Sequence, residues 1–131
     1  MKASEMDNKE FSRKLEKRTR EFGVRIILLS TTLPKTPEGR EIGTQITKSG
    51  TSISAHYREA NRARSRADFK NRVKMCESEA SETQYWPEII SDLKWSPYEK
   101  PKSEYEECSE LLAIFSSIGK KDKSGLKFSS L

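Results

Sequence analysis

Positively charged side chains gather between residues 58 and 74, and their spacing suits the binding of phosphate groups. This stretch holds seven Lys or Arg against two acidic residues. Arg58 and Arg62 share one helix face, while Arg66, Lys70 and Lys74 form an i, i+4, i+8 stripe on the next predicted helix. Cations about 5–6 Å apart release condensed counterions when they dock on a phosphate backbone. The pattern predicts a nucleic-acid-binding surface at the tip of a helical hairpin.

A second group of cations lies on one exposed face of the first predicted helix and extends the candidate surface. The same charges would also suit a face that serves only solubility, or a surface for an acidic protein partner. Tyr57, beside the cluster, is expected either to be buried or to stack on an unpaired base. The candidate nucleic-acid-binding residues are Arg13, Lys17, Arg20, Arg58, Arg62, Arg64, Arg66, Lys70 and Lys74.

The two halves of the chain carry opposite net charge. Residues 1–75 hold 18 Lys or Arg against 9 acidic residues, a net charge of +9, whereas residues 76–131 hold 7 against 11, a net charge of −4. The basic half can attract a phosphate backbone, and the acidic half can attract the basic half of another copy. The charge pattern thus predicts both nucleic-acid binding and contacts between copies.

Residues for enzymatic chemistry are scarce. His56 is the one histidine of the sequence, and no metal-ligand spacing, nucleophile motif or phosphate loop is present. We expect His56 to be a packed or interface residue. Cys76 and Cys108 occupy apolar helical positions, which favours reduced, buried thiols. The sequence predicts a protein that is not an enzyme and that carries neither a metal nor a cofactor.

The composition of the 131 residues indicates one domain with a thin core. Charged residues make up 34% and apolar residues 33% of the sequence. No apolar run approaches the roughly 20 residues that cross a bilayer, and the N-terminal residues show no secretory pattern. We therefore expect a cytoplasmic protein without a membrane partner.

Apolar spacing predicts two helices in the first half. The first has a capping-box pattern at Asp7 and carries a continuous stripe at Phe11, Leu15, Phe22, Ile26, Leu29 and Leu33. Val24, Ile27 and Leu28 widen that stripe, which suggests burial on two sides. We expect Thr36 to cap the second helix, which runs from Pro37 to about Arg62. A close backbone approach would explain its three interior glycines, and the alternative is a weak, partly frayed helix.

Two further helices complete the prediction. Ser65 caps a long third helix, which we expect to continue through Pro87 with a kink. Ser103 caps the fourth, and Gly119 ends it. Four amphipathic helices with short connections predict an all-α, antiparallel up-down-up-down four-helix bundle over residues 1–119, followed by a basic flexible tail over residues 120–131.

Several segments in combination resemble the bacterial four-helix bundle proteins encoded in intervening sequences of large-subunit ribosomal RNA genes. The resemblance runs from about Phe11 to Phe115. The segments that carry it are 18–22, 33–39, 49–53, 57–60, 63–69 and 82–86. Two positions depart from the usual pattern of the family, His56 in place of Asn and Pro87 in place of Leu.

The resemblance implies a bundle that assembles as a ring, commonly a homopentamer, and that has no enzymatic activity. Related bundles are the accessory variability determinants of diversity-generating retroelements, which bind nucleic acid and a reverse transcriptase through a basic surface. Residues and resemblance together predict an oligomeric, non-enzymatic bundle that binds nucleic acid, with structured RNA as the expected ligand. The alternative is a protein-interaction scaffold that docks a partner such as a reverse transcriptase.

Overall fold

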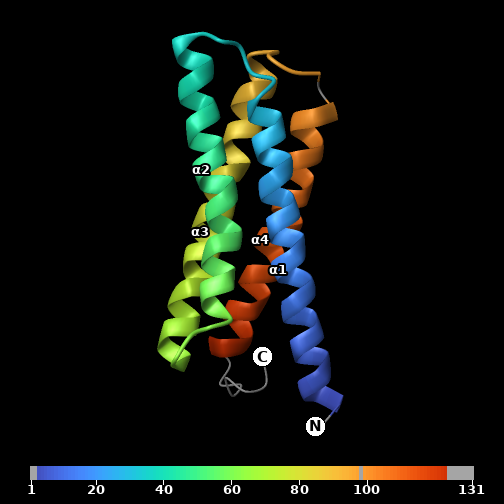
Figure 1. Cartoon of the computed structure of the whole chain (residues 1–131), viewed down its shortest axis with the longest axis vertical. Coiled ribbons are helices and arrows are strands. Elements are labelled where there is room, and N and C mark those ends of the chain that lie inside the picture. Colours follow the sequence, from blue (N-terminus) through green and yellow to red (C-terminus); the bar gives the residue numbers. More distant parts are fainter. Residues whose placement is uncertain (1–2, 98, 124–131) are drawn as a thin grey trace.

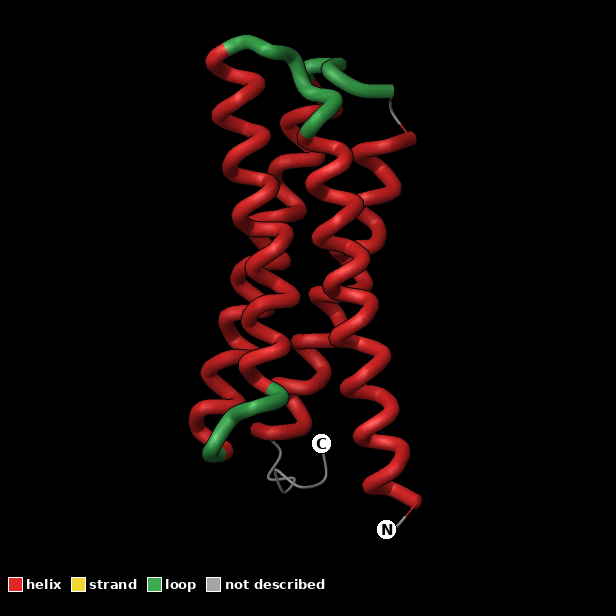
Figure 2. Tube along the Cα trace, in the orientation of Figure 1, coloured by secondary structure: helices red, strands yellow, loops and turns green. Residues whose placement is uncertain are grey.

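The computed structural model describes residues 3–97 and 99–123, which form four α-helices. These are α1 (Ala3–Ser30), α2 (Pro37–Ala60), α3 (Arg66–Asp92) and α4 (Glu99–Lys123). Figure 2 shows helices joined by short loops, and the described residues contain no strand. The prediction of an all-α four-helix bundle is confirmed. Within the same residues, no helix combines the length and apolar character needed to span a bilayer.

Successive helices alternate in direction along the long axis of the molecule (Figure 1). Side-chain pairs show that α1 and α4 run in opposite directions, because Arg18 pairs with Glu107 and the later Arg25 pairs with the earlier Glu104. The α2–α3 connection therefore lies at the same end of the bundle as the first turns of α1 and the last turns of α4. The α1–α2 and α3–α4 connections lie at the opposite end.

The core is built from the apolar stripes of all four helices. Ile26, Ile46, Cys76 and Leu111 represent the four helices in it, and each is fully buried. The stripe predicted for the first helix is buried except at Phe11, which is 44% exposed, and for this residue the prediction was wrong. Phe11 is exposed because the first turns of α1 lie apart from the other helices, as Figures 1 and 2 show.

Capping side chains fix two of the helix starts as the sequence predicts. Thr36 Oγ1 accepts a hydrogen bond from the backbone N–H of Gly39 at 3.1 Å, and Ser65 Oγ accepts one from Asp68 at 3.0 Å. Each bond satisfies a donor that the first helical turn leaves unpaired. Helix α3 then runs without interruption through the buried Pro87, so the predicted continuous helix is confirmed.

Three predicted helix ends were wrong. Helix α1 begins at Ala3, so Asp7 lies inside it. Helix α4 begins at Glu99 instead of Ser103, whose hydroxyl accepts a hydrogen bond from Arg25 Nη2 at 3.1 Å. Proline fits a first turn because no N–H is needed there, and Pro101 allows this earlier start. Helix α4 also continues past Gly119 to Lys123, while residues 124–131 of the predicted tail lie outside the described residues.

Both cysteine side chains are buried and reduced, as predicted. The thiol of Cys76 faces the Ile53 carbonyl at 3.7 Å, and that of Cys108 donates to the Ala80 carbonyl at 3.1 Å. Desolvation by burial raises the pKa of each thiol to about 12. Both groups therefore stay protonated at neutral pH, and they serve packing instead of nucleophilic chemistry.

The glycines of α2 allow close approach within the chain. A Cβ atom on Gly50 would lie 2.8–3.1 Å from the side chain of Ile26 on α1. A Cβ atom on Gly39 would clash with the carbonyl of Pro34 in the preceding loop. At Gly43 the same atom would meet Ser30 and Leu33 only at ordinary contact distances of 3.8 Å or more. Two of the three glycines are thus explained by a neighbouring segment of the same chain.

The first prediction concerns this contrast between glycines. Gly50→Ala should lower the free energy of unfolding by about 1 kcal/mol, because overpacking against Ile26 outweighs the gain in helix propensity. Gly43→Ala, the matched control, should raise the same quantity by up to about 1 kcal/mol, because the added methyl group fits. Urea unfolding followed by circular dichroism measures both variants. An equal gain for the two would show that α1 and α2 do not approach closely at Gly50.

Candidate nucleic-acid interface

Eight of the nine predicted cationic residues are exposed, and Lys70 is partly buried. They fall into two groups, one on α1 and one around the α2–α3 connection. Both groups lie at the same end of the bundle, because that connection sits beside the N-terminal half of α1 (Figure 1). Asn61, at the end of α2, joins the two elements directly through a 2.8 Å hydrogen bond from its side-chain amide to Glu16 on α1.

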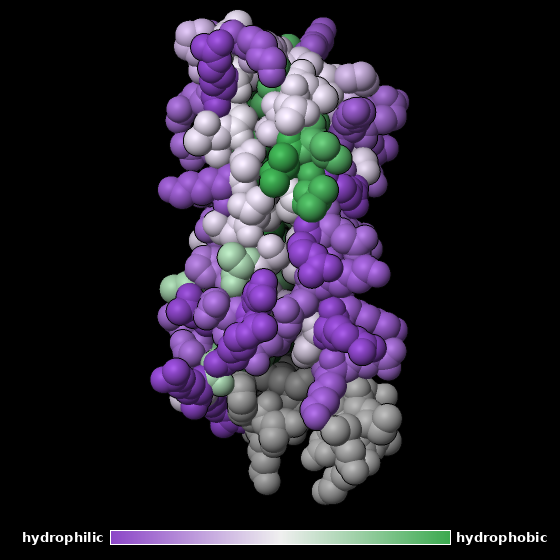
Figure 3. Space-filling view, viewed as in Figure 1, coloured by the Kyte–Doolittle hydropathy of each residue, from purple (hydrophilic) through white to green (hydrophobic). Residues whose placement is uncertain are grey.

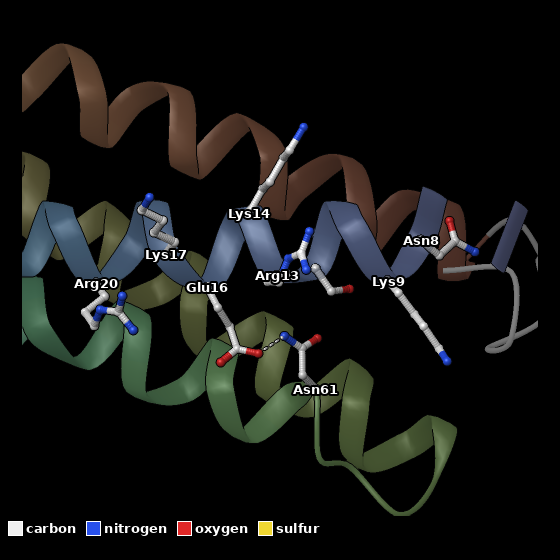
Figure 4. Close-up of a pocket in the computed structure, with 9 residues that line it drawn as sticks. Asn8, Lys9, Arg13, Lys14, Glu16, Lys17, Arg20 and Asn61 are labelled. Atoms are coloured by element: carbon white, nitrogen blue, oxygen red, sulfur yellow. Dashed lines mark hydrogen bonds between the residues drawn. The ribbon is translucent and has the colours of Figure 1, made fainter. Parts of the chain in front are cut away.

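A groove of about 700 Å³ lies beside this hydrogen bond. Figure 4 shows its lining, which comes from α1 except for Asn61. The structure brings Arg13, Lys17 and Arg20 together there, whereas the predicted cations of α2 and α3 lie outside the lining. The complete lining is Asn8, Lys9, Ser12, Arg13, Lys14, Glu16, Lys17, Arg20 and Asn61.

Lys9 and Lys14 line the groove but are not among the residues predicted from the sequence. Lys9 precedes Arg13 by four residues and Lys17 by eight, so helical spacing could have identified it. Lys14 pairs with Glu10 at 3.1 Å, in an exposed i, i+4 pair that screening weakens. Its presence in the groove depends on the curvature of the surface, which the sequence does not show.

The groove is strongly cationic because its lining contains one carboxylate. The lining contains five lysine and arginine side chains and the single acid Glu16, and Asn61 donates a hydrogen bond to that carboxylate. The hydrogen bond directs Glu16 toward α2 and occupies one of its oxygens (Figure 4). An anion approaching the groove would therefore meet an excess of positive charge.

The cations around the α2–α3 connection form a more open surface. Arg62 folds back so that its Nη1 donates to the Arg58 carbonyl at 3.2 Å, and Arg72 lies 3.8 Å from Asp68. Tyr57 is buried, with its ring 5.6 Å from the ring of Phe115. Desolvation is the main cause of its raised pKa. Tyr57 is thus a core residue and offers no stacking surface for a base.

The acidic residues of α4 pair with α1 in the same chain. Arg18 donates to both carboxylate oxygens of Glu107, at 2.8 and 2.7 Å, and lies 3.3 Å from Glu110. Arg25 donates twice to Glu104, at 3.1 and 2.7 Å. The hydrogen bond from Arg18 is the main cause of the lowered pKa of the Glu107 carboxyl. Some of the opposite charges of the two halves of the sequence therefore pair within one molecule.

His56 lies at the interface between α2 and α3. Its side chain is 27% exposed, and Nε2 lies 3.9 Å from a carboxylate oxygen of Glu79 across the α2–α3 interface. The described residues contain no group of three or more His, Cys, Asp or Glu side chains placed to hold a metal ion. This position agrees with the expectation of a packed histidine.

An apolar patch lies on the outer side of α1. Val24, Ile27 and Leu28 are 53%, 41% and 60% exposed, and they form the apolar patch that is visible over the upper half of α1 in Figure 3. The sequence predicts that these residues are buried on a second side of the helix, but within one chain they are exposed. They are available to another molecule.

Comparisons with known proteins point to one family. The model of a family described as 23S rRNA-intervening sequence protein matches residues 8–117. A crystal structure of a protein of unknown function from the S23 ribosomal protein family of Bacteroides thetaiotaomicron is 36% identical in sequence, with a TM-score of 0.75. The similarity covers 80% of this chain and 97% of that one. No curated protein matches the sequence.

The second prediction concerns the ion pair between α1 and α4. Glu107→Gln should lower the free energy of unfolding by about 1 kcal/mol at pH 7, after allowance for solvent screening of the partly exposed Arg18. Because the folded-state pKa of Glu107 is lowered, the contribution is present above the unfolded value of about 4.3 and is lost as the pH falls through the folded value. The gap between wild type and variant should therefore close below about pH 4.

Urea unfolding at pH 7, 5, 4 and 3 measures this gap. Glu110→Gln is the control, because its side chain is 68% exposed and should contribute little to stability. A gap that stays constant down to pH 3 would contradict the assigned role of Glu107.

Proposed function

The chain belongs to the family of 23S rRNA-intervening sequence proteins, and from this premise we propose that it is a non-enzymatic bundle that binds RNA through the cationic end described above. The observation that carries the proposal is the groove beside Asn61, whose lining contains five cations and one hydrogen-bonded carboxylate. The exposed arginines around the α2–α3 connection extend the same end of the surface.

RNA is the preferred ligand class for two reasons. The description of the family associates its members with an intervening sequence of 23S rRNA. Exposed lysine and arginine side chains at helical spacing also suit a phosphate backbone, which they neutralise with release of counterions. Contacts of this kind fix position and give little base specificity, so RNA shape is expected to decide which RNA binds.

The third prediction tests RNA binding at the groove. The logarithm of the affinity for a 16-base-pair RNA hairpin should fall linearly with the logarithm of salt concentration, by about 0.9 for each phosphate contact. The variant Arg13→Ala/Lys17→Ala should flatten this slope by about one to two units, because two groove cations are removed. Fluorescence anisotropy at several salt concentrations measures the slope.

A charge-matched control separates local contacts from net charge. Lys94 and Lys100 are exposed at the opposite end of the bundle, so Lys94→Ala/Lys100→Ala changes the net charge equally. Its slope should match the wild type. Equal slopes for all three proteins, or no RNA binding by the wild type at low salt, would overturn the proposed function.

We also propose that the protein self-associates, with the homopentamer as the expected assembly. The support is the apolar patch of Val24, Ile27 and Leu28 together with the small core of each chain. Exposed apolar residues grouped in this way mark contact surfaces, and in a ring the patch would pack on a different surface of the neighbouring copy. The same patch favours the alternative function, in which the bundle is a scaffold that docks a partner protein such as a reverse transcriptase.

The fourth prediction tests self-association. Light scattering at micromolar concentration should give a mass well above the 15.1 kDa of one chain. Val24→Gln/Leu28→Gln should shift the protein toward the monomer, because polar side chains replace the centre of the patch. Leu93→Gln, at an exposed position on another helix end, should leave the mass unchanged. A wild-type mass of 15.1 kDa would refute self-association and turn the search toward a different protein partner.

A further inference from the structure

A second cationic groove lies between α1 and α2 at the other end of the bundle. Its volume is about 660 Å³, and its cations are Lys35, Arg40 and Lys48. No acidic residue lines it, and the nearby Glu38 and Glu41 of α2 lie outside its lining. The candidate site derived from the sequence does not include these three cations. The two grooves thus occupy opposite ends of one face of the molecule.

The outer side of α2 connects the two ends. Arg58 follows Arg40 by 18 residues, which is five complete turns, so the two arginines lie on the same side of α2 about 27 Å apart. Thr47 and Thr51 lie between them on the same side, and both are partly exposed. This side therefore has a cation at each end and hydroxyl groups in the middle.

Between the two grooves, α1 packs closely against α2. Gly23 is buried there, and a Cβ atom on it would touch Thr51 of α2 at 3.6 Å. Figure 3 shows a white strip of residues of intermediate hydropathy on this face, with hydrophilic residues beside and below it. A long ligand could lie along this strip and reach both cationic ends.

We propose that the α1–α2 face is one continuous docking track for RNA, in which Arg40 and Lys48 bind phosphates at one end and the groove with Arg13 and Lys17 binds them at the other. This inference rests on the proposed RNA-binding function and enlarges its footprint. The chemistry favours a polyanion with charges along its length, because each groove supplies cations and the strip between them supplies neutral hydrogen-bonding groups.

The distance between the two ends sets a length requirement. Arg40 and Arg58 lie about 27 Å apart along α2, and an A-form RNA duplex rises less per base pair than the 3.4 Å of B-DNA, so this distance takes more than about eight base pairs. An RNA hairpin with a 16-base-pair stem spans both ends, whereas one with a four-base-pair stem reaches a single end. The footprint can therefore be measured by changing the length of the RNA.

The test is the fifth prediction and compares Arg40→Ala/Lys48→Ala with wild type on hairpins of both stem lengths. For the 16-base-pair hairpin, the slope of log affinity against log salt should flatten by about one to two units. The four-base-pair hairpin reaches only one cationic end of the protein, so its slope should change by clearly less. Both substituted side chains are exposed, and circular dichroism should show an unchanged fold. Lys94→Ala/Lys100→Ala is again the charge-matched control.

Each remaining outcome has a defined meaning. If the wild type binds the long hairpin and Arg13→Ala/Lys17→Ala flattens its slope, but Arg40→Ala/Lys48→Ala does not, the track is refuted and the RNA-binding function stands. If no variant alters the slope, the proposed function fails first. If Arg40→Ala/Lys48→Ala weakens binding of poly-glutamate and leaves RNA binding unchanged, the second groove serves an acidic protein and the inference is wrong.

Discussion

The close approach of α1 and α2 at Gly50 organises both the fold and the candidate surface. Ile26 packs against the backbone of α2 because Gly50 presents no side chain, and a Cβ atom there would lie within 2.8 Å of it. This contact holds the C-terminal half of α1 against the middle of α2. One groove lies on each side of the contact along the same helix pair, the first beside Asn61 and the second where Gly39 and Gly43 of α2 face the end of α1. The packing of α1 against α2 thus sets the line along which both grooves lie.

Helix α1 makes three different contacts around its circumference. Its inner side buries Phe22 and Ile26, and the side toward α4 carries Arg18 and Arg25, which bind carboxylates of α4. Burial and charge-assisted hydrogen bonds thus hold the helix from two directions. These two arginines are paired within the chain, so the net charge overstates the number of cations that are available to a ligand. The outer side retains Arg13, Lys17 and Arg20.

Patterns with a local physical cause were predictable from the sequence, and features that depend on several helices were not. Thr36 and Ser65 were identifiable as caps because each bonds within its own first turn. The start of α4 was missed because the tertiary bond from Arg25 uses Ser103, while Pro101 tolerates an earlier start. The groove was found in part: helical spacing grouped Arg13, Lys17 and Arg20, but the contribution of Asn61 depends on how α2 ends beside α1. Nothing in the spacing of Arg40 and Lys48 linked them to α1.

The two proposed activities share one side of α1, and this links them thermodynamically. Arg13, Lys17, Arg20, Val24 and Ile27 follow one another at intervals of four, three, four and three residues, so cations and apolar patch lie in one stripe. In a ring, the neighbouring copy that covers the patch must also lie close to the cations of the same stripe, and the cost of removing these charges from water would oppose the gain from apolar burial. RNA phosphates would neutralise those cations. If both proposals hold, RNA must strengthen self-association, and self-association must strengthen RNA binding by the same factor, because a coupling free energy acts equally on both equilibria.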